Sequence, residues 1–355
     1  MSQVWPIDPQ HPDPHVLTRA GARLRAGALV AFPTETVYGL GANALDAAAV
    51  ARIFTAKGRP AYDPLIVHVA APDEVPQVAR RVPDLAYRLW ERFAPGPLTL
   101  ILPKHPAVPE AVTAGKDTIA VRIPAHPVAL GLIRAAGVPV AAPSANKFGH
   151  TSPTTAQHVL DDLGTAVDVI LDAGPTPVGV ESTILDITRE PPVLLRPGGV
   201  PREALEEVLG RPIVLAGAVQ QPHQARAPGM LPRHYAPRVP LWLFDGPRAW
   251  AREALWQTAA QMAHGQGQRV AALVPREDAG RLRGLGVMVA DLGPEEDLEA
   301  MARALFAGLR ALEAAAPDVI LARTVGEARL GLAIDDRLRR AAAHIVRPTA
   351  AAPQP

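Results

Sequence analysis

Polar and charged side chains interrupt several apolar segments in the first 200 residues, and their types suit the binding of anions. PTETVYGLGANA places two threonines and a glutamate directly after an apolar run, and KGRPAYDPLIVHV carries Lys57 and an arginine at the end of a predicted helix. In TIAVRIPAHP, Arg122 lies inside an apolar run and would share one face of a regular strand with Thr118. Because a buried arginine is costly without an anionic partner, Arg122 either forms a buried salt bridge or holds an anionic ligand.

Further polar residues follow predicted strands, at positions where α/β sheets usually receive ligands. The segments APSANKFGHTSP, VESTILDIT and LLRPGG supply Ser144, Asn146, Ser152, Ser182 and Arg196. Taken one at a time, such residues are typical of capped turns. Taken together, their hydroxyl, amide and guanidinium groups predict a lining for a triphosphate and a small zwitterion. Such a lining favours nucleotidyl or phosphoryl transfer, in which alignment and neutralised phosphate charge supply most of the acceleration.

The sequence argues against several other kinds of catalytic or binding site. Ser144 and Ser182 lack the surroundings of a nucleophile elbow, so no Ser-His-Asp grouping is predicted. The chain has no P-loop motif. It also has no cysteine, which excludes a disulfide scaffold, a cysteine-ligated zinc and a thiol nucleophile. The acidic and histidine residues within 11–15 lie in a proline-broken arm, which argues against a metal site there.

Gly39, Gly41 and Ala44 match the outline of a dinucleotide fingerprint, G-x-G-x-x-A, and Asp63 follows about 20 residues later. The residues before the first glycine are polar, whereas the fingerprint requires a strand that runs straight into it. We therefore interpret these glycines as permitting a tight turn between a strand and a helix.

The elements that position these residues follow from hydrophobic periodicity and turn-forming residues. Residues 15–27 and 45–60 have helical spacing, the second with Asp46 as N-cap and Gly58 as its stop. Apolar, β-branched runs predict strands at 28–35, 65–70, 98–103, 118–124, 138–146, 167–174 and 182–188. Further helices are predicted around 84–93, 127–136 and 155–162. This irregular mixture predicts an α/β domain with a twisted, mixed sheet.

With 355 residues, of which 48 % are hydrophobic and 20 % charged, the chain is long and apolar enough for about two domains. We predict a catalytic domain at 1–210, a linker or lid at 211–238, a C-terminal domain at 239–345 and a tail at 346–355. The linker contains PGM and HYAP, whose turn formers, aromatic and histidine argue against a pure spacer.

The segment after the linker alternates regularly between the two kinds of element. Strands are predicted at 239–245, 269–275, 287–292 and 318–324. Helices are predicted near 248–263, 277–283, 294–314 and 331–343. This alternation predicts a smaller, Rossmann-like α/β domain with a parallel sheet.

The net charge and the hydropathy of the chain argue against nucleic acid and membranes as general binding partners. Lys+Arg 36 against Asp+Glu 35 give a net charge of +1, so no global field attracts nucleic acid or an anionic membrane, and any polyanion site is local. The N-terminal segment lacks the basic start and apolar run of a signal peptide, and no run reaches the ~18 apolar residues of a membrane span. We expect a cytoplasmic protein without membrane attachment.

Seven ordered segments resemble the YrdC/Sua5 family of threonylcarbamoyl-AMP synthases, which act in tRNA t6A biosynthesis. They are PTETVYGLGANA, KGRPAYDPLIVHV, FAPGPLTLIL, TIAVRIPAHP, APSANKFGHTSPT, VESTILDIT and LLRPG, and they cover roughly residues 15–205. PGMLPRHYAP and GLAIDDRLRRAA further resemble the long, two-domain Sua5 form. The resemblance implies that L-threonine, bicarbonate or CO2, and ATP give threonylcarbamoyl-AMP and pyrophosphate for modification of tRNA position 37.

The resemblance also implies roles for individual residues. A threonine site would comprise Thr36, His68, Arg122, Ala142 and Ser182, with the two-pronged donors of Arg122 suited to the carboxylate. An ATP site would comprise Lys57, Arg59, Asp63, Thr118, Ser144, Asn146, Ser152, Arg196 and Tyr235. Lys57 and Arg59 are the residues expected to act in catalysis, and Tyr235 would close over the nucleotide as part of a lid. Mg2+ is expected with the triphosphate, although no ligand for it stands out, and a tRNA threonylcarbamoyl transferase is expected to receive the product.

One position departs from the family pattern, because Asp63 stands where asparagine is expected and a carboxylate would repel phosphates unless it helps to hold Mg2+. Two other functions remain open. A double-stranded RNA-binding module is one, because we expect the domain to have a basic concave face, although the near-zero net charge of the chain argues against RNA binding. A carbamoyl-transfer domain for another substrate occurs within hydrogenase-maturation proteins, but beside acylphosphatase and zinc-finger segments that this chain lacks.

Overall fold

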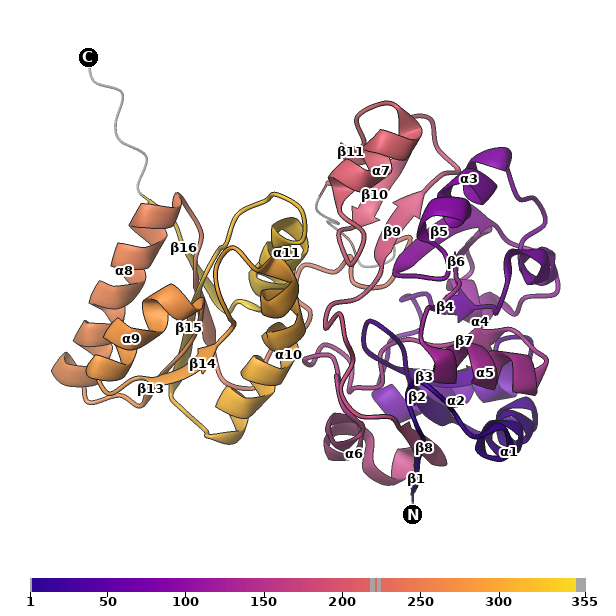
Figure 1. Ribbon diagram of the computed structural model, residues 1–355, viewed down its shortest axis with the longest axis horizontal. Helices are drawn as coiled ribbons and strands as arrows, with labels where there is room; N and C mark the ends of the chain where they lie inside the picture. Colours follow the sequence, from indigo (N-terminus) through magenta and orange to yellow (C-terminus); the bar gives the residue numbers. More distant parts are fainter. Residues whose placement is uncertain (1, 218–220, 222–224, 349–355) are drawn as a thin grey trace. The chain divides into compact units, whose positions relative to one another are not determined.

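The computed structural model describes residues 2–217, 221 and 225–348. The chain forms two compact units, the first made of Met1–Phe148 and Ser152–Pro232 and the second of Gly149–Thr151 and Arg233–Pro355. Each unit consists of a sheet with helices (Figure 1). The predicted fold class, a mixed α/β domain followed by a smaller parallel one, is confirmed.

The described strands of the first unit form one eleven-stranded sheet in the order β1-β8-β2-β3-β7-β4-β6-β5-β9-β10-β11. Parallel and antiparallel pairs are both present: β4 and β6 pair in parallel, and β5 and β6 antiparallel. The strands are β1 (Gln3–Pro6), β2 (Val30–Pro33), β3 (Tyr38–Asn43), β4 (Ile66–His68), β5 (Leu98–Pro103), β6 (Thr118–Arg122), β7 (Val140–Ala141), β8 (Val169–Asp172), β9 (Thr183–Asp186), β10 (Val193–Arg196) and β11 (Val214–Leu215).

The helices of the first unit begin and end largely where the sequence predicts. The Asp46 side chain accepts hydrogen bonds from the N–H groups of Ala48 and Ala49, and Gly58 ends the same helix in the left-handed region at φ 62°. The helices are α1 (Pro14–Arg25), α2 (Ala47–Lys57), α3 (Asp84–Phe93), α4 (Glu110–Thr113), α5 (Pro127–Ala136), α6 (Ala156–Leu163) and α7 (Arg202–Leu209), with 3-10 turns η1 (Pro72–Gln77) and η2 (Gly164–Ala166).

Helices α1 and α5 pack together over one part of the sheet. Leu17 and Leu24 of α1 share a core with Leu132 of α5 and with Phe32 of β2. A Cβ atom at Gly21 would lie 2.6 Å from the backbone of Ala135, so glycine is required where the two helices approach. This packing fixes β2, and with it the turn that follows β2.

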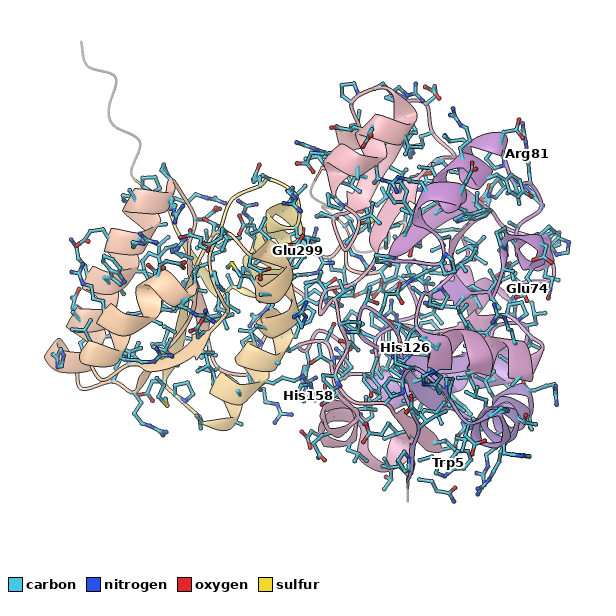
Figure 2. All side chains as sticks on the ribbon, in the orientation of Figure 1. Trp5, Glu74, Arg81, His126, His158 and Glu299 are labelled. Atoms are coloured by element: carbon cyan, nitrogen blue, oxygen red, sulfur yellow. The ribbon has the colours of Figure 1, made fainter. Side chains whose placement is uncertain are left out.

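One element at the start of the chain was not predicted from the sequence. Residues Gln3–Pro6 form β1, which pairs in parallel with β8, whereas the proline-broken arm was predicted around residues 11–15. Trp5 of β1, labelled in Figure 2, lies under Arg19 of α1, whose guanidinium carbon is 4.3 Å from the ring centroid. Cation–π stacking of this kind gives a polar segment a reason to be ordered.

Gly39 and Gly41 lie within β3, which pairs antiparallel with β2, and not in a turn between a strand and a helix. A Cβ atom at Gly41 would lie 2.8 Å from the Phe32 ring and 3.0 Å from Val140. The glycines therefore permit close side-chain packing across the sheet. The dinucleotide fingerprint has no structural counterpart, and our interpretation of a tight turn was wrong in its location.

The second unit has a parallel five-stranded sheet in the order β14-β13-β15-β12-β16 within the described residues. Figure 1 shows α8 and α9 on one face of this sheet and α10 and α11 on the other. The elements are β12 (Leu241–Phe244), α8 (Arg248–Ala260), the π-helical η4 (Gln261–Gly265), β13 (Val270–Val274), α9 (Arg276–Gly284), β14 (Met288–Asp291), α10 (Leu298–Ala314), β15 (Val319–Arg323), α11 (Gly331–Ala341) and β16 (His344–Val346). The described part of the chain contains no helix whose length and apolar character suit a membrane span.

The predicted linker is partly built into the first unit. Ala225, Ala227, Met230 and Leu231 are buried in a core cluster with apolar residues of β4, β5, β6 and β9. The Arg226 guanidinium lies 3.3 Å from the carboxylate of Asp186, which is itself fully buried. This segment therefore covers one face of the sheet, and the predicted linker residues 218–220 and 222–224 lie outside the described residues.

Candidate active site

Three polar residues form a row across neighbouring strands of the first unit. His68 of β4 is the register partner of Arg122 of β6, and Arg122 is in turn the partner of Thr99 of β5. Register partners point their side chains to the same face of a sheet. All three are buried, so one face carries an imidazole, a guanidinium and a hydroxyl side by side.

The next row along the same strands is apolar, and it is the row that the linker covers. Ile66, Ala120 and Ile101 are register partners on β4, β6 and β5, and all belong to the cluster that includes Met230 and Leu231. The polar row therefore lies beside a face from which solvent is excluded, where charges and hydrogen bonds act more strongly than in water.

Arg122 pairs with an acidic residue from the turn between β2 and β3. Its Nη2 lies 2.7 Å from Glu35 Oε1, and both side chains are almost fully buried. Glu35 Oε2 accepts a hydrogen bond from the Ala125 N–H at 3.0 Å. The next residue, His126, caps α5 by accepting from the Val128 N–H (Figure 2). The buried salt bridge that the sequence allowed for Arg122 is thus present, and it orients a guanidinium that has five N–H donors in all.

Ser182, directly before β9, is held by residues from two sides. Its Oγ lies 2.7 Å from Thr99 Oγ1, and it accepts a hydrogen bond from Arg196 Nη2 at 3.1 Å. Arg196 also donates from Nε and Nη2 to the Ser182 carbonyl, and from Nη1 to the Pro228 carbonyl of the linker. Ser182, which was predicted to bind the substrate threonine, therefore contacts Arg196, which was predicted to bind ATP.

Lys57, at the end of α2, reaches the loop after β7. Its Nζ donates to the carbonyls of Ser144 at 2.6 Å and Asn146 at 2.5 Å. Burial and the nearby Arg59 guanidinium hold the pKa of Lys57 well below its usual range. The lysine thus joins α2 to Ser144 and Asn146, two other residues of the predicted ATP set. A negative charge placed near its Nζ would raise its pKa.

Arg59 and Asp63 form a buried ion pair just beyond α2. Arg59 Nη2 lies 2.9 Å from Asp63 Oδ2, and Arg59 also donates to the carbonyls of Asp63 and Pro64. Burial raises the pKa of Asp63, while four cations act in the opposite direction. These are Arg59, Lys57, Lys116 and Arg196, in decreasing order of effect. Two of these cations are arginines, which stay charged, so the cluster suits an anionic ligand.

His68 is neutral over the physiological pH range. Burial, with a smaller effect from Arg122, lowers its pKa to about 3. Its Nδ1 is buried and has no hydrogen-bond partner within the described residues, while its ring meets Phe32 edge to face at a centroid distance of 6.4 Å. A neutral imidazole with an unsatisfied nitrogen can accept or donate a hydrogen bond without adding charge.

The remaining predicted site residues take the following places. The Thr36 N–H donates to Thr34 Oγ1 in the turn after β2, and the Ala142 N–H donates to the Ile66 carbonyl beside β4. Thr118 begins β6, on the face of Ala120 and Arg122. Ser152 Oγ donates to Glu181 Oε1 at 2.5 Å. Tyr235 belongs to the second unit, so its role as a cover over the nucleotide stays a prediction.

A resident metal site is not formed by the side chains that the structure describes. Those residues contain no group of three acidic, histidine or cysteine ligands. Asp63, the carboxylate within the predicted ATP set, is already paired with Arg59. The donor set present therefore does not fit a protein-held Mg2+ ion, which requires several oxygen ligands or waters at near-octahedral geometry.

Comparisons with known proteins identify the family of this chain. A family model described as "telomere recombination", covering Sua5, YciO and YrdC, matches residues 22–198, and one described as "threonylcarbamoyl-AMP synthase, C-terminal domain" matches residues 200–343. A Pyrococcus abyssi protein named threonylcarbamoyl-AMP synthase is 47 % identical over 92 % of this chain and 93 % of its own. The chain belongs to the Sua5/YrdC family.

Two further matches span nearly the whole of this Sua5/YrdC protein, one to a sequence and one to a solved structure. A Bacillus subtilis protein of the same name is 44 % identical over 93 % of both chains. The crystal structure of P. abyssi Sua5 complexed with L-threonine superposes with a TM-score of 0.89 at 43 % identity, covering 98 % of this chain and 100 % of that one. The likeness therefore extends over both units and not over the first alone.

The sequence reasoning missed Thr99 and Glu181 as members of the candidate site, and it noted Glu35 beside the threonines of PTETV without assigning it a role. Glu35 and Glu181 stand beside predicted residues in PTETV and VEST, so their adjacency was an available signal. Thr99 gave a weaker one, a hydroxyl inside the apolar run LTLILP. Its importance depends on its pairing with β6 and its contact with Ser182, which only the fold reveals.

Proposed function

We propose that this protein is an L-threonylcarbamoyladenylate synthase. It forms threonylcarbamoyl-AMP and pyrophosphate from L-threonine, bicarbonate or CO2, and ATP. The observation that carries the proposal is the contact of Ser182 with Arg196, because it joins an amino-acid subsite to a cationic nucleotide subsite on one sheet face. The names of the P. abyssi and B. subtilis relatives support the same activity.

The amino-acid subsite suits a small zwitterion. Arg122, oriented by Glu35, offers its remaining N–H donors to the threonine carboxylate. Thr36, His68, Ala142 and Ser182 complete the proposed set. Their hydroxyl groups and the neutral imidazole provide hydrogen bonds to the threonine hydroxyl and amine without a second full charge.

The nucleotide subsite suits a triphosphate. Lys57, Arg59 and Arg196 supply positive charge, and Thr118, Ser144, Asn146 and Ser152 are proposed to contact the nucleotide through hydroxyl and amide groups. A phosphate close to Lys57 would favour its ammonium form, offsetting the burial that lowers its pKa. We propose Lys57 and Arg59 as the catalytic pair, because they stabilise charge that moves toward pyrophosphate in the transition state.

The chemistry proceeds by in-line displacement. The threonine ammonium loses one proton to solvent, and the free amine adds to CO2. The carbamic acid that forms loses a second proton to solvent and gives a carbamate. A carbamate oxygen then attacks the α-phosphorus, the bond between the α-phosphorus and its bridging oxygen breaks, and pyrophosphate leaves with the electron pair. Alignment of the two substrates by the joined subsites supplies the entropic part of the acceleration.

Mg2+ enters this proposal as part of the substrate MgATP, since the described side chains do not form a resident metal site. No step is assigned to the ion. Asp63 is proposed to stay behind Arg59 as its partner, at the edge of the ATP set.

Two segments of the chain would protect a reactive product. The buried segment that contains Met230 and Leu231 keeps water from the sheet face, which protects a mixed anhydride from hydrolysis. Tyr235 is proposed to complete this cover over the nucleotide. The adenylate would pass to a tRNA threonylcarbamoyl transferase in the cytoplasm for t6A formation at position 37, so the synthase itself needs no direct contact with nucleic acid.

The test is pyrophosphate release by the purified protein with MgATP, L-threonine and bicarbonate, together with the mass of the adenylate. Release should require both co-substrates and should fall at least about 100-fold in Arg59→Ala and Arg122→Ala. Arg52→Ala, which removes an exposed arginine from α2, is the matched control and should keep wild-type turnover. A folded protein that binds ATP but releases no pyrophosphate would overturn the proposal.

A further inference from the structure

A buried threonine hydroxyl adjoins the proposed amino-acid subsite, and no task has been assigned to it. Thr99 of β5 is fully buried and is the register partner of Arg122 on β6. Side chains at such positions lie next to each other on one face of the sheet. The Thr99 Oγ1 atom lies 2.7 Å from Ser182 Oγ, and within the described residues this is the one hydrogen bond that the Thr99 side chain forms. All three residues belong to the first unit.

The oxygen atoms of this hydroxyl pair are held in place by the sheet. Strand β5 pairs with β6 on one side and with β9 on the other, so Thr99 lies in the interior of the sheet. Directly after Ser182, the Thr183 N–H donates to the Pro97 carbonyl at 2.9 Å. Arg196 also donates twice to the Ser182 carbonyl. Because both backbones are fixed and both side chains are fully buried, the directions of the two hydroxyl protons are the remaining freedom of the pair.

The available donors and acceptors decide these directions. Each hydroxyl has one proton and two lone pairs. Arg196 Nη2 can only donate, and it occupies one lone pair of Ser182 Oγ at 3.1 Å. If Ser182 donated to Thr99, the Thr99 proton would be buried without an acceptor among the described residues, which is unfavourable. Donation from Thr99 to Ser182 avoids this unpaired proton.

With Thr99 as the donor, the Ser182 hydroxyl has one capacity left. Both of its lone pairs are occupied, by Thr99 and by Arg196, so its own proton is available to a ligand. The carboxylate and hydroxyl oxygens of an amino acid can accept this proton, whereas an ammonium group can only donate. The arrangement therefore suits a ligand oxygen, as does the neighbouring guanidinium of Arg122, which also can only donate.

We propose that Thr99 is a positioning residue for L-threonine, whose hydroxyl donates to Ser182 and thereby directs the Ser182 proton to an oxygen of the substrate. The inference rests on the proposed function, in which Ser182 contacts threonine. It deepens that function in two respects. It adds a residue that acts on the substrate through another side chain, and it assigns Ser182 to an acceptor oxygen of the amino acid.

The experiment removes the Thr99 hydroxyl in the full-length protein. Thr99→Val retains the branched shape of threonine but has no proton to donate. The matched control is Thr113→Val, because Thr113 is a similarly buried threonine of the first unit whose hydroxyl donates to the Glu110 carbonyl within α4. Binding of L-threonine and of MgATP is measured separately by calorimetry. We expect Thr99→Val to weaken L-threonine binding about tenfold, with ATP binding within about twofold of wild type and the control unchanged for both ligands.

Two further variants distinguish positioning from a general structural effect. Thr99→Ser keeps the hydroxyl and should bind L-threonine within about threefold of wild type. If Thr99 acts through Ser182, then Thr99→Val adds less than about twofold to the loss of L-threonine affinity in Ser182→Ala. Four results would each overturn the inference: wild-type threonine affinity in Thr99→Val, equal losses for threonine and ATP, a loss in Thr99→Ser as large as in Thr99→Val, or fully multiplicative losses with Ser182→Ala.

A smaller side chain covers the case in which Thr99→Val does not fold. Thr99→Ala also lacks the hydroxyl, and it brings no new atoms into the interior of the sheet. It should weaken L-threonine binding at least about tenfold, and wild-type threonine affinity in this variant would overturn the inference. A wild-type protein that binds no L-threonine would instead contradict the proposed function.

Discussion

Arg196 Nη2 donates to Ser182 Oγ at 3.1 Å, and the same guanidinium donates twice to the Ser182 carbonyl. Both residues are buried, and the other hydroxyl contact of Ser182 is with Thr99 on β5. In the proposed reaction Ser182 faces threonine and Arg196 faces ATP. The contact therefore gives the two substrates a shared boundary, at which the carbamate and the α-phosphorus must meet.

This boundary predicts energetic coupling between the two subsites. Ser182→Ala should weaken L-threonine binding about tenfold, and Arg196→Lys should weaken both ligands because lysine cannot reproduce the forked donation. In a double-mutant cycle, the combined loss of threonine affinity should be smaller than the product of the single losses by about fivefold or more. Calorimetric titration of the four proteins measures this, and strictly multiplicative losses would contradict the coupling.

A second prediction concerns the buried pair of Glu35 and Arg122. Glu35→Gln keeps an acceptor for the Ala125 N–H but leaves the guanidinium without its neutralising charge. We expect the free energy of unfolding to fall by about 1–3 kcal/mol. The KM for L-threonine should rise about tenfold with kcat changed less, because the carboxylate partner is misoriented.

The control for Glu35→Gln is Glu74→Gln, labelled in Figure 2, whose carboxylate accepts the Ala70 N–H, whereas the ion pair of Arg122 is with Glu35. It should leave the KM for L-threonine at the wild-type value. An unchanged KM in Glu35→Gln would show that the pair serves stability alone.

Much of the fold follows from local signals, whereas the contacts within the site do not. Helix α2 begins after Asp46 and ends before Gly58 as predicted, because capping and left-handed termination are encoded by neighbouring residues. Thr99 and Ser182 are 83 residues apart, and their contact depends on the parallel pairing of β5 with β9. Pairing across a sheet is set by the whole topology, and no spacing in the sequence specifies it.

The same reasoning explains the glycines of β3. Spacing alone matched Gly39 and Gly41 to a nucleotide-binding turn, since both situations require the absence of a side chain. The requirement at Gly41 comes instead from Phe32 and Val140 on neighbouring strands. A sequence pattern identifies where a Cβ atom is excluded, but only the fold identifies what excludes it.

A third prediction uses the lowered pKa of His68. Because this pKa is about 3, the imidazole is neutral from pH 5.5 to 8, and its protonation should not alter L-threonine affinity in that range. Calorimetric titration should show less than a threefold change that is traceable to His68. In His68→Gln, affinity should fall about tenfold while the pH profile keeps its shape. A wild-type titration near pH 6.5 that is absent in His68→Gln would contradict the prediction.

The lowered pKa also has a consequence for stability. The unfolded chain, with an ordinary histidine pKa of 6.5, binds a proton that the folded protein does not bind between pH 6.5 and about 3. His68 therefore makes the folded state less stable as pH falls through that range, by up to about 1.4 kcal/mol per pH unit. Its contribution is constant above pH 6.5.

The last prediction concerns Asp335, a buried carboxylate of α11 in the second unit. Its two oxygens accept hydrogen bonds from the Val325 and Gly326 N–H groups, at 2.8 and 3.0 Å. Burial nevertheless raises its pKa from 3.8 to about 7, with Arg339 acting against the shift and Asp245 adding to it. The carboxylate thus orders the loop after β15 at the cost of holding a charge away from water.

The sign of the resulting pH dependence is opposite to that of a salt-bridged carboxylate. Between pH 3.8 and about 7 the folded state binds the Asp335 proton and the unfolded state does not, so this group lowers the free energy of unfolding as pH rises. The slope reaches about 1.4 kcal/mol per pH unit, and the effect is complete above pH 7.

Asp335→Asn should remove this slope, because the amide does not titrate. The control is Glu299→Gln, which removes an exposed carboxylate of α10 that pairs with Arg329, and this variant should retain the slope. Calorimetric unfolding of the full chain from pH 4.5 to 8 measures the difference, and parallel curves for wild type and Asp335→Asn would show that Asp335 titrates as an ordinary carboxylate.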